Sequence, residues 1–247
     1  MGDKMKKILL SALIISSAFS GNFGVDIALI GQLPKGEFKD EGVPTGFGLD
    51  INGLWYPSNI LGLGINLGGT RYGSSERPEP WSKTIPDVTV TVKTTNDLVY
   101  GHLLARVVPL QGKSRLYFEG LLGIKNLFTS TKVISEDCPG DDDTCELASS
   151  RNYTNNAFSY GGGGGLEIIL TSFGGDEDSD IKGGEGSDIE GVLSFFINAR
   201  YMIGAEAEYL KKGDIHRMDQ EPYDVTYSPS RSKTDVLQIS LGLNFNF

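Results

Sequence analysis

Alternation of apolar and polar residues, repeated along almost the whole chain, is the feature that most constrains its fold. In 46–55, for example, Phe47, Leu49 and Ile51 alternate with glycine, aspartate and asparagine. Successive side chains of a β-strand point to opposite faces, so this period predicts strands with one apolar and one polar face. The same period occurs in eight segments: 25–33, 46–55, 60–69, 98–108, 115–125, 158–170, 195–209 and 237–247. Because only the N-terminus departs from this pattern with a helical period, we predict an all-β protein of eight strands.

The connections between these segments alternate in length. Short ones lie at 56–59 and 109–114, and long ones run over 73–94, 130–156 and 210–233. Long loops at one end and short turns at the other predict an up-and-down meander of antiparallel strands. The connection 172–191 occupies the position of a short turn and is long, and the sequence assigns it no role.

The polar face decides between two kinds of closed barrel. A water-soluble, lipocalin-like barrel keeps its apolar side chains inside, whereas a membrane barrel turns them outward. The polar face consists mainly of Gly, Asn, Asp, Ser and Gln, and glycine makes up 33 of the 247 residues. Such a face covers a soluble surface poorly but leaves room inside a narrow barrel. We therefore predict an eight-stranded antiparallel up-and-down transmembrane β-barrel, whose tilted strands span an apolar band of about 25 Å.

The N-terminus predicts export. Three lysines precede an apolar run, 8–15, that is too short to cross a bilayer as a helix. Small residues follow, and cleavage after Ser20 divides the chain into a signal peptide, 1–20, and a barrel domain, 21–247. This order of charged, apolar and small residues favours a signal peptide over a buried helix. The net charge of −10 argues against nucleic acid as a partner.

The final residues, SLGLNFNF, continue the alternation to the terminus at Phe247. We predict that this strand pairs with 25–33 and closes the barrel, so that neither edge stays free. Here the chain resembles the small outer-membrane β-barrel family of the OmpA/OmpX type, over essentially all of the mature chain. Ser240, Gly242, Phe245 and Phe247 are similar to the terminal pattern that the barrel-assembly machinery reads in that family. The resemblance implies a bacterial outer-membrane protein with the lipid bilayer and that machinery as partners; we expect a monomer without a cofactor.

Charged residues interrupt the inward face. The predicted interior charge network comprises Asp26, Asp50, Arg106, Glu119, Lys125, Glu167, Arg200 and Glu206, with Glu208 and His102 nearby. Two interpretations are open: a gated or ion-selective path, or a plug of paired charges. Buried charges need partners, and an eight-stranded barrel is barely wide enough for its own side chains. These constraints favour the plug.

The loops carry further candidate sites. Cys138 and Cys145 predict a disulfide, since an exported chain meets an oxidising environment. The acidic stretches 141–143 and 176–180 are either weak calcium sites or solvated loops, and the second lacks the glycine and the final glutamate of a calcium loop. His216 is the one candidate base for a lipid-modifying site, although a lone loop histidine is usually solvated.

These observations favour a non-enzymatic outer-membrane barrel with a plugged polar interior. Its long extracellular loops would make surface contacts, or its body would stabilise the membrane. Alternation in 88–92 predicts a strand that projects beyond the bilayer, where an extracellular ligand would bind. The alternatives are a narrow porin-like channel for small solutes or ions and a lipid-modifying enzyme.

Overall fold

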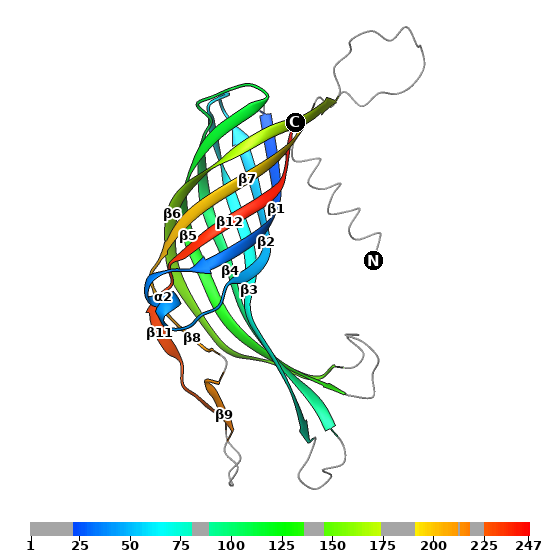
Figure 1. Cartoon of the computed structure of the whole chain (residues 1–247), viewed down its shortest axis with the longest axis vertical. Helices are drawn as coiled ribbons and strands as arrows, with labels where there is room; N and C mark the ends of the chain where they lie inside the picture. Colours follow the sequence, from blue (N-terminus) through cyan, green and yellow to red (C-terminus); the bar gives the residue numbers. More distant parts are fainter. Residues whose placement is uncertain (1–21, 81–88, 136–145, 174–190, 212, 218–224) are drawn as a thin grey trace, which may run out of the picture.

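The computed structural model describes residues 22–80, 89–135, 146–173, 191–211, 213–217 and 225–247, and eight long strands close into one antiparallel barrel (Figure 1). The barrel strands are β1 (Asn22–Pro34), β2 (Gly46–Tyr56), β3 (Leu61–Pro80), β4 (Thr89–Val107), β5 (Ser114–Ser135), β6 (Glu146–Phe173), β7 (Gly191–Gly204) and β12 (Val236–Asn246). Their order around the barrel is β1-β12-β7-β6-β5-β4-β3-β2. The predicted eight-stranded up-and-down topology is therefore confirmed.

The last strand closes the barrel against the first. Ala28 lies opposite Gly242 in the β1–β12 register, and the pairing continues to the terminus, where Phe23 and Phe247 exchange two backbone hydrogen bonds of 3.1 and 2.8 Å. A Cβ atom at Gly242 would lie 2.3 Å from the carbonyl oxygen of Ile27, so only glycine allows the two strands to approach this closely. Closure leaves no edge along the barrel.

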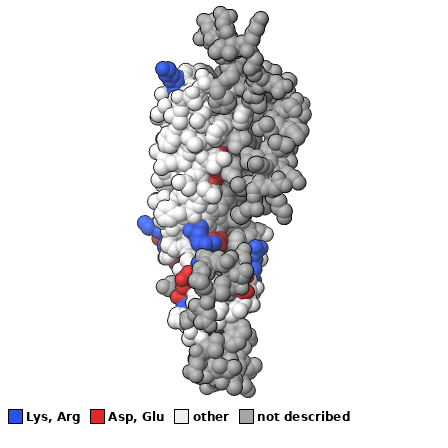
Figure 2. All heavy atoms as spheres, turned by 90° about the vertical axis from the view of Figure 1, so that its right-hand side faces the viewer, with Lys and Arg blue, Asp and Glu red and all other residues white. Residues whose placement is uncertain are grey.

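The outward side chains form a continuous apolar belt. Leu29 and Phe47 are each 70% exposed, and Leu103 is 66% exposed. The other members include Ile27, Leu49, Ile51, Ile65, Leu67, Leu122, Ile124, Ile168, Ile197 and Leu241. On the face drawn in Figure 2 this band shows few charged side chains, and most of the Lys, Arg, Asp and Glu side chains lie below it. A belt of this extent faces lipid, which confirms the predicted orientation of the strands.

Two hairpins continue beyond the belt, at the end of the barrel opposite the C-terminus (Figure 1). The sequence predicts loops over 73–94 and 130–156, but most of these residues are strand: β3 stays paired with β4 as far as Pro80, and β5 with β6 as far as Glu146. The alternation that predicted a projecting strand over 88–92 lies at the start of β4, at Thr89, whereas the other extensions were expected as loops. Thr and Val, which favour strand, recur in these extensions. We call this end of the molecule the loop end and the other the terminus end.

The connection between β7 and β12 also contains strands. The prediction of one strand over 195–209 is wrong in its second part, because β7 stops at Gly204, whose N–H donates to Asp235 Oδ1 at 2.9 Å. The chain then leaves the barrel, and β8 (Glu206–Tyr209) pairs with β11 (Ser230–Lys233). A second small pair, β9 (Ile215–Arg217) with β10 (Val225–Tyr227), lies further out. Alternation alone did not reveal this exit, since it continues through Tyr209.

An aromatic cap covers the interior at the loop end. The short helix α2 (Gly36–Asp40), which the sequence did not predict, buries Phe38 to 2% exposure. The Phe38 ring meets Tyr209 edge-on at 5.0 Å and Tyr72 at 6.2 Å between ring centroids. These three residues, Phe38, Tyr72 and Tyr209, form the aromatic cap and join the first and last loops to β3. No helix in the described part of the chain is both long and apolar enough to cross a membrane.

The position of the belt predicts a depth-dependent cost of charge. Leu103 lies in the middle of the apolar run of β4, whereas Leu147, 49% exposed, lies on β6 beyond the belt. We expect Leu103→Arg to lower the free energy of unfolding in lipid vesicles by about 2–4 kcal/mol and Leu147→Arg by about 0–1 kcal/mol. Urea titrations of the refolded barrels measure both values, and equal losses would contradict the placement of the belt.

Candidate functional site

The interior holds a cluster of buried charges at mid-barrel. Arg106 on β4 and Glu119 on β5 are direct partners in the strand register, and Arg106 Nε and Nη2 donate to Glu119 Oε1 at 2.9 and 2.6 Å. Arg106 also pairs with Asp26 on β1. The side chains of Arg106 and Asp26 are both almost completely buried. Because β4 and β1 are not neighbours in the barrel, this ion pair links two separate parts of the wall.

A second arginine extends the cluster across the lumen. Arg200 on β7 donates through Nε to Glu119 Oε2 at 2.7 Å and through Nη1 to Asp50 Oδ2 on β2 at 2.8 Å. Glu119 therefore bridges both guanidinium groups. We call Asp26, Asp50, Arg106, Glu119 and Arg200 the central ion cluster; it connects five of the eight strands.

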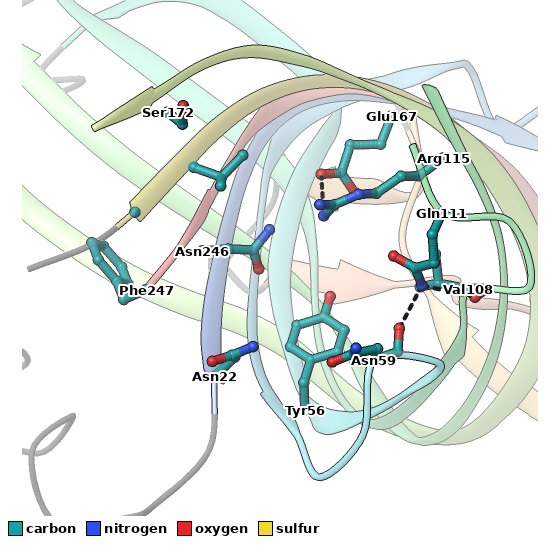
Figure 3. A pocket seen from close by; sticks show the side chains of 12 residues that line it. Asn22, Tyr56, Asn59, Val108, Gln111, Arg115, Glu167, Ser172, Asn246 and Phe247 are labelled. Carbon is teal, nitrogen blue, oxygen red and sulfur yellow. Dashed lines mark hydrogen bonds and ion pairs between the residues drawn. The ribbon is translucent and has the colours of Figure 1, made fainter. Parts of the chain in front are cut away.

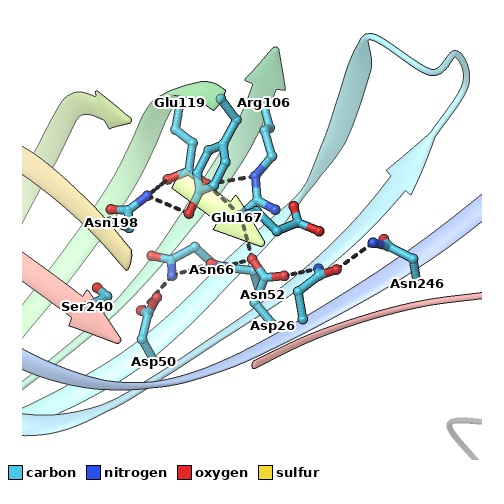
Figure 4. Close-up of polar contacts among 12 residues, drawn as sticks. Asp26, Asp50, Asn52, Asn66, Arg106, Glu119, Glu167, Asn198, Ser240 and Asn246 are labelled. Atoms are coloured by element: carbon cyan, nitrogen blue, oxygen red, sulfur yellow. Dashed lines mark hydrogen bonds and ion pairs between the residues drawn. The ribbon is translucent and has the colours of Figure 1, made fainter. Parts of the chain in front are cut away.

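Neutral polar side chains complete the hydrogen bonding of the cluster (Figure 4). Each carboxylate accepts at least one further bond: Asp26 from Asn52 at 2.8 Å, Asp50 from Asn66 at 2.7 Å and from Tyr100 at 2.6 Å, and Glu119 from Asn198 at 2.9 Å. This is the condition under which buried ions are tolerated, since each unpaired charge would carry a large desolvation cost. Sequence reasoning placed these asparagines on the inward face but assigned them no partners, because partners depend on register across strands.

The other predicted interior residues lie apart from the central ion cluster. Lys125 Nζ donates to the backbone carbonyl of Thr234, which precedes the last barrel strand, β12. Glu167 is buried and faces Arg115 at 3.6 Å, a partner that the sequence did not suggest. His102 Nδ1 lies 3.1 Å from Asn66 Oδ1, beside the cluster.

Glu206 corrects the predicted network. It does not face the interior: it belongs to β8, outside the barrel, and pairs with Arg231 at 2.8 Å with half of its side chain exposed. The exit of the chain at Ala205 removes it from the inward face. Glu208 also lies on β8 and accepts a hydrogen bond from Tyr153. In this site outside the membrane span, burial and the contact with Glu208 raise the pKa of Tyr153 to about 12.

A cavity of about 520 Å³ opens at the terminus end (Figure 3). Tyr56, Arg115, Glu167 and Gln111 line it, and Gln111 Nε2 fixes the nearby turn by donating to the carbonyl of Asn59 at 2.6 Å. The Tyr56 hydroxyl accepts a bond from Arg106 Nη1 at 3.3 Å, so the inner side of the cavity meets the central ion cluster.

A larger cavity, of about 1430 Å³, lies at the loop end. We call it the vestibule. It lies between the extended hairpins, the first loop at Glu41–Pro44 and the last loop at Lys211–Ile215, and Tyr72 of the aromatic cap lines it. The lumen thus has a cavity at each mouth, with the central ion cluster and the aromatic cap between them.

Several predicted sites lie outside the described residues. These are Ser20 with the signal peptide, the Cys138–Cys145 disulfide, and the acidic stretches 141–143 and 176–180. The backbone of His216 lies in β9 opposite Thr226. Within the described ranges, no group of three or more His, Cys, Asp or Glu side chains is arranged to hold a metal ion.

An apolar belt around a closed antiparallel sheet, with paired charges inside, defines a transmembrane β-barrel of the outer-membrane type. Only a closed sheet satisfies its backbone hydrogen bonds in lipid. The even strand number is that of bacterial outer-membrane barrels, and the protein is located in that membrane.

Solved structures of outer-membrane proteins are similar to this chain. Ail, the attachment invasion locus protein of Yersinia pestis, is 16% identical, with 93% of this chain and 100% of that chain covered and a TM-score of 0.37. Neisserial surface protein A is 10% identical, covering 92% and 98%, with a TM-score of 0.37. The outer membrane protein OprG from Pseudomonas aeruginosa is 12% identical, covering 92% and 96%, with a TM-score of 0.40. No protein-family model and no curated protein matches the chain.

The likeness to these structures is one of fold. The class rests on the barrel itself, through its closure, its belt and its lining.

The central ion cluster predicts unequal effects of two arginine substitutions. Arg200→Met leaves Asp50 and Glu119 short of a buried partner, and we expect it to lower the free energy of unfolding by about 3–5 kcal/mol. Arg71→Met breaks an exposed pair with Asp97, of 2.8 Å, and should cost less than about 1 kcal/mol. Urea unfolding in lipid vesicles compares them; a small loss for Arg200→Met would show that the cluster contributes little.

Proposed function

We propose that the protein is a non-enzymatic integral outer-membrane barrel with a closed interior and a loop end that faces the cell exterior and makes surface contacts. The orientation follows the rule that bacterial barrels keep short turns in the periplasm and longer loops outside. At the terminus end the β2–β3 and β4–β5 connections fit this rule, and the long β6–β7 connection departs from it. The observation that carries the proposal is the central ion cluster. Its bonds run between strands that are not neighbours, such as β7 to β2 through Arg200 and Asp50, and so cross the lumen.

Two further features support a closed interior. Arg106 and Arg200 are both only 1% exposed, so solvent at either mouth does not reach them. The aromatic cap adds a second closure, because Phe38 and Tyr209 are buried above the interior at the loop end. An eight-stranded barrel has little space beyond that of its own side chains, so these groups suffice to fill it.

A narrow channel is the second candidate, and the two cavities favour it. The terminus-end cavity reaches the central ion cluster through Tyr56, and the vestibule reaches the aromatic cap through Tyr72. A rearrangement of the cluster and the cap together would be needed to join the cavities. The closed arrangement is the one supported by the described contacts.

Single-channel recording tests the closed interior. For the wild-type barrel in planar bilayers we expect no sustained conductance steps, since paired arginines cross the lumen. Steps in the wild type that disappear when Arg106 or Arg200 is replaced would favour the channel instead. Replacement of the exposed Arg71 and Arg231 serves as the control for a general change in charge.

We also propose that Ser240, Gly242, Phe245 and Phe247 form the assembly signal. Ser240 is buried inside the barrel, whereas the Phe247 side chain faces outward and its backbone already pairs with Phe23. The Phe247 ring is therefore available for recognition while its backbone closes the barrel. Leu243, on the same strand and also facing outward, has the same exposed fraction of 39% and lies outside the signal.

A matched pair of substitutions tests this role. We expect Phe247→Ala to lower the amount of barrel in the outer membrane of living cells several-fold and Leu243→Ala to lower it much less. The free energies of unfolding of the two variants, refolded in detergent, should differ little because both remove an outward apolar side chain of equal exposure. If Phe247→Ala lowers the amount of barrel in cells and the free energy of unfolding in detergent to a similar extent, Phe247 does not act in assembly.

A further inference from the structure

The vestibule combines a large volume with walls that belong to well-paired strands. Its volume of about 1430 Å³ exceeds the range of about 300–1,000 Å³ that is usual for small-molecule pockets. One wall is formed by the extensions of β3 to β6, and the opposite wall comes from the first and last loops. Such a cavity has room for an extended ligand of several units.

Two β-bulges direct side chains into this space. In the β3–β4 ladder the register shifts between Arg71 and Gly73, so Tyr72 is the extra residue. In the β5–β6 ladder Tyr153 and Arg151 pair with consecutive residues, so Asn152 is the extra residue. Both Tyr72 and Asn152 line the vestibule. Bulges re-aim side chains and are frequent next to binding sites, and here two separate bulges serve one cavity.

The strand wall is rich in neutral hydrogen-bonding groups. Its hydroxyl and amide side chains include Ser74, Thr94, Asn96, Thr131, Ser150 and Asn152. Some of them are already ordered by mutual contacts: the hydroxyls of Thr94 and Thr131 lie 3.2 Å apart, and Thr129 donates to Asn96 at 2.8 Å. A wall of this kind offers both donors and acceptors to a ligand that carries many hydroxyl groups.

The charged groups of the vestibule pair with one another. Lys211 contacts Glu41 at 2.8 Å, and its hydrogen bond and charge lower the pKa of that carboxyl. Glu76 pairs with Lys93 at 3.1 Å and Glu79 with Arg77 at 3.1 Å. Four carboxylates and two cations line the cavity, counting Asp214, so a polyanion would meet net repulsion.

The floor of the vestibule contains an unsatisfied polar atom. Tyr72 is 5% exposed, and its hydroxyl oxygen is buried without a hydrogen-bond partner among the described residues. A buried hydroxyl without a partner is unfavourable, and a ligand hydroxyl at this point would supply one. Tyr72 lines the cavity, and its enclosed hydroxyl would meet a ligand hydroxyl when the side chain turns toward the vestibule.

From these observations we infer that the vestibule binds a neutral oligosaccharide, with the Tyr72 hydroxyl and the amide oxygen of Asn152 as direct contacts. The Asn152 Nδ2 group donates to Thr131 Oγ1 at 2.5 Å, and this bond orients the amide. The inference rests on the proposed function in that the loop end faces outward. Capture of a peptide strand is disfavoured at the outer edge of β3 beyond Arg71, which carries Pro78 and Pro80 and lacks their N–H groups for a ladder. The outer edge of β6 before Ser159 contains no proline, so the peptide probe tests that edge.

Binding by the purified, refolded full-length chain in detergent tests the inference. The probes are an array of neutral hexose and N-acetylhexosamine oligosaccharides, sulfated and sialylated oligosaccharides of the same lengths, and a neutral unstructured peptide. We expect binding within the neutral class alone. The inference is overturned if no neutral oligosaccharide binds, or if the sulfated probes or the peptide bind as tightly as the best neutral one.

Three variants assign the contacts for the best neutral probe. Tyr72→Phe and Asn152→Ala should each weaken binding about threefold to tenfold, as expected for loss of one hydrogen bond. Tyr160→Phe, which changes an outward tyrosine on the belt, should leave it unchanged. Because the Tyr72 hydroxyl has no partner among the described residues, Tyr72→Phe should not lower the stability to urea. If Tyr72→Phe binds the probe with unchanged affinity, the Tyr72 hydroxyl is not a direct contact of the ligand.

A further arm distinguishes the sources of the sugar. Competition by lipopolysaccharide with a neutral polysaccharide chain would indicate a glycan of the cell's own surface, whereas competition by soluble glycans alone would indicate an external one. Binding in detergent does not depend on membrane orientation or conductance. If no oligosaccharide binds, the proposal of a closed barrel is unaffected, because single-channel recording tests that proposal separately.

Discussion

The requirement that every backbone N–H and C=O be paired in lipid governs this structure. A strand edge left open in the hydrocarbon region would expose a row of such groups, each at a cost of several kcal/mol. The pairing of β1 with β12, complete to the terminal Phe247, removes both edges at once. Closure requires close approach of the two strands, which Gly242 permits. The apolar belt, the narrow lumen and the contrast between the two ends all follow from this closed ladder.

Closure at eight strands leaves an interior that side chains must fill, and the sequence fills it with charge. Placing Arg106 and Arg200 in a space without solvent would be unfavourable alone, so each shares Glu119 and holds a further carboxylate. Asparagine and tyrosine complete the bonding around them. A cluster tied to five strands also fixes their relative register, because a slip of one residue would turn an inward ion toward lipid.

Alternation predicted the eight strands, the closing pair and the outward face, since one buried and one lipid-facing surface leave a clear period of two. It failed where the chain leaves the barrel without losing that period, and Glu206 was therefore placed inside. It also could not locate the bulges at Tyr72 and Asn152, which add one residue without a distinctive composition. The pairing of residues within the central ion cluster could not be predicted from the sequence for a different reason. Arg200 and Asp50 are 150 residues apart and meet only through the stagger of non-adjacent strands.

The two ends of the barrel differ because lipid constrains only the middle. Within the belt, a bulge would leave a backbone group unpaired in hydrocarbon, whereas beyond it water satisfies such groups. One register shift, between Ile169 and Thr171 of β6, lies toward the terminus end. The bulges at Tyr72 and Asn152, the exit of the chain after Gly204 and the proline-containing edge of β3 lie at the loop end. Irregular backbone is what re-aims side chains into a common space. The physical freedom that makes this end hard to predict from sequence is therefore also what allows it to hold a specific polar cavity.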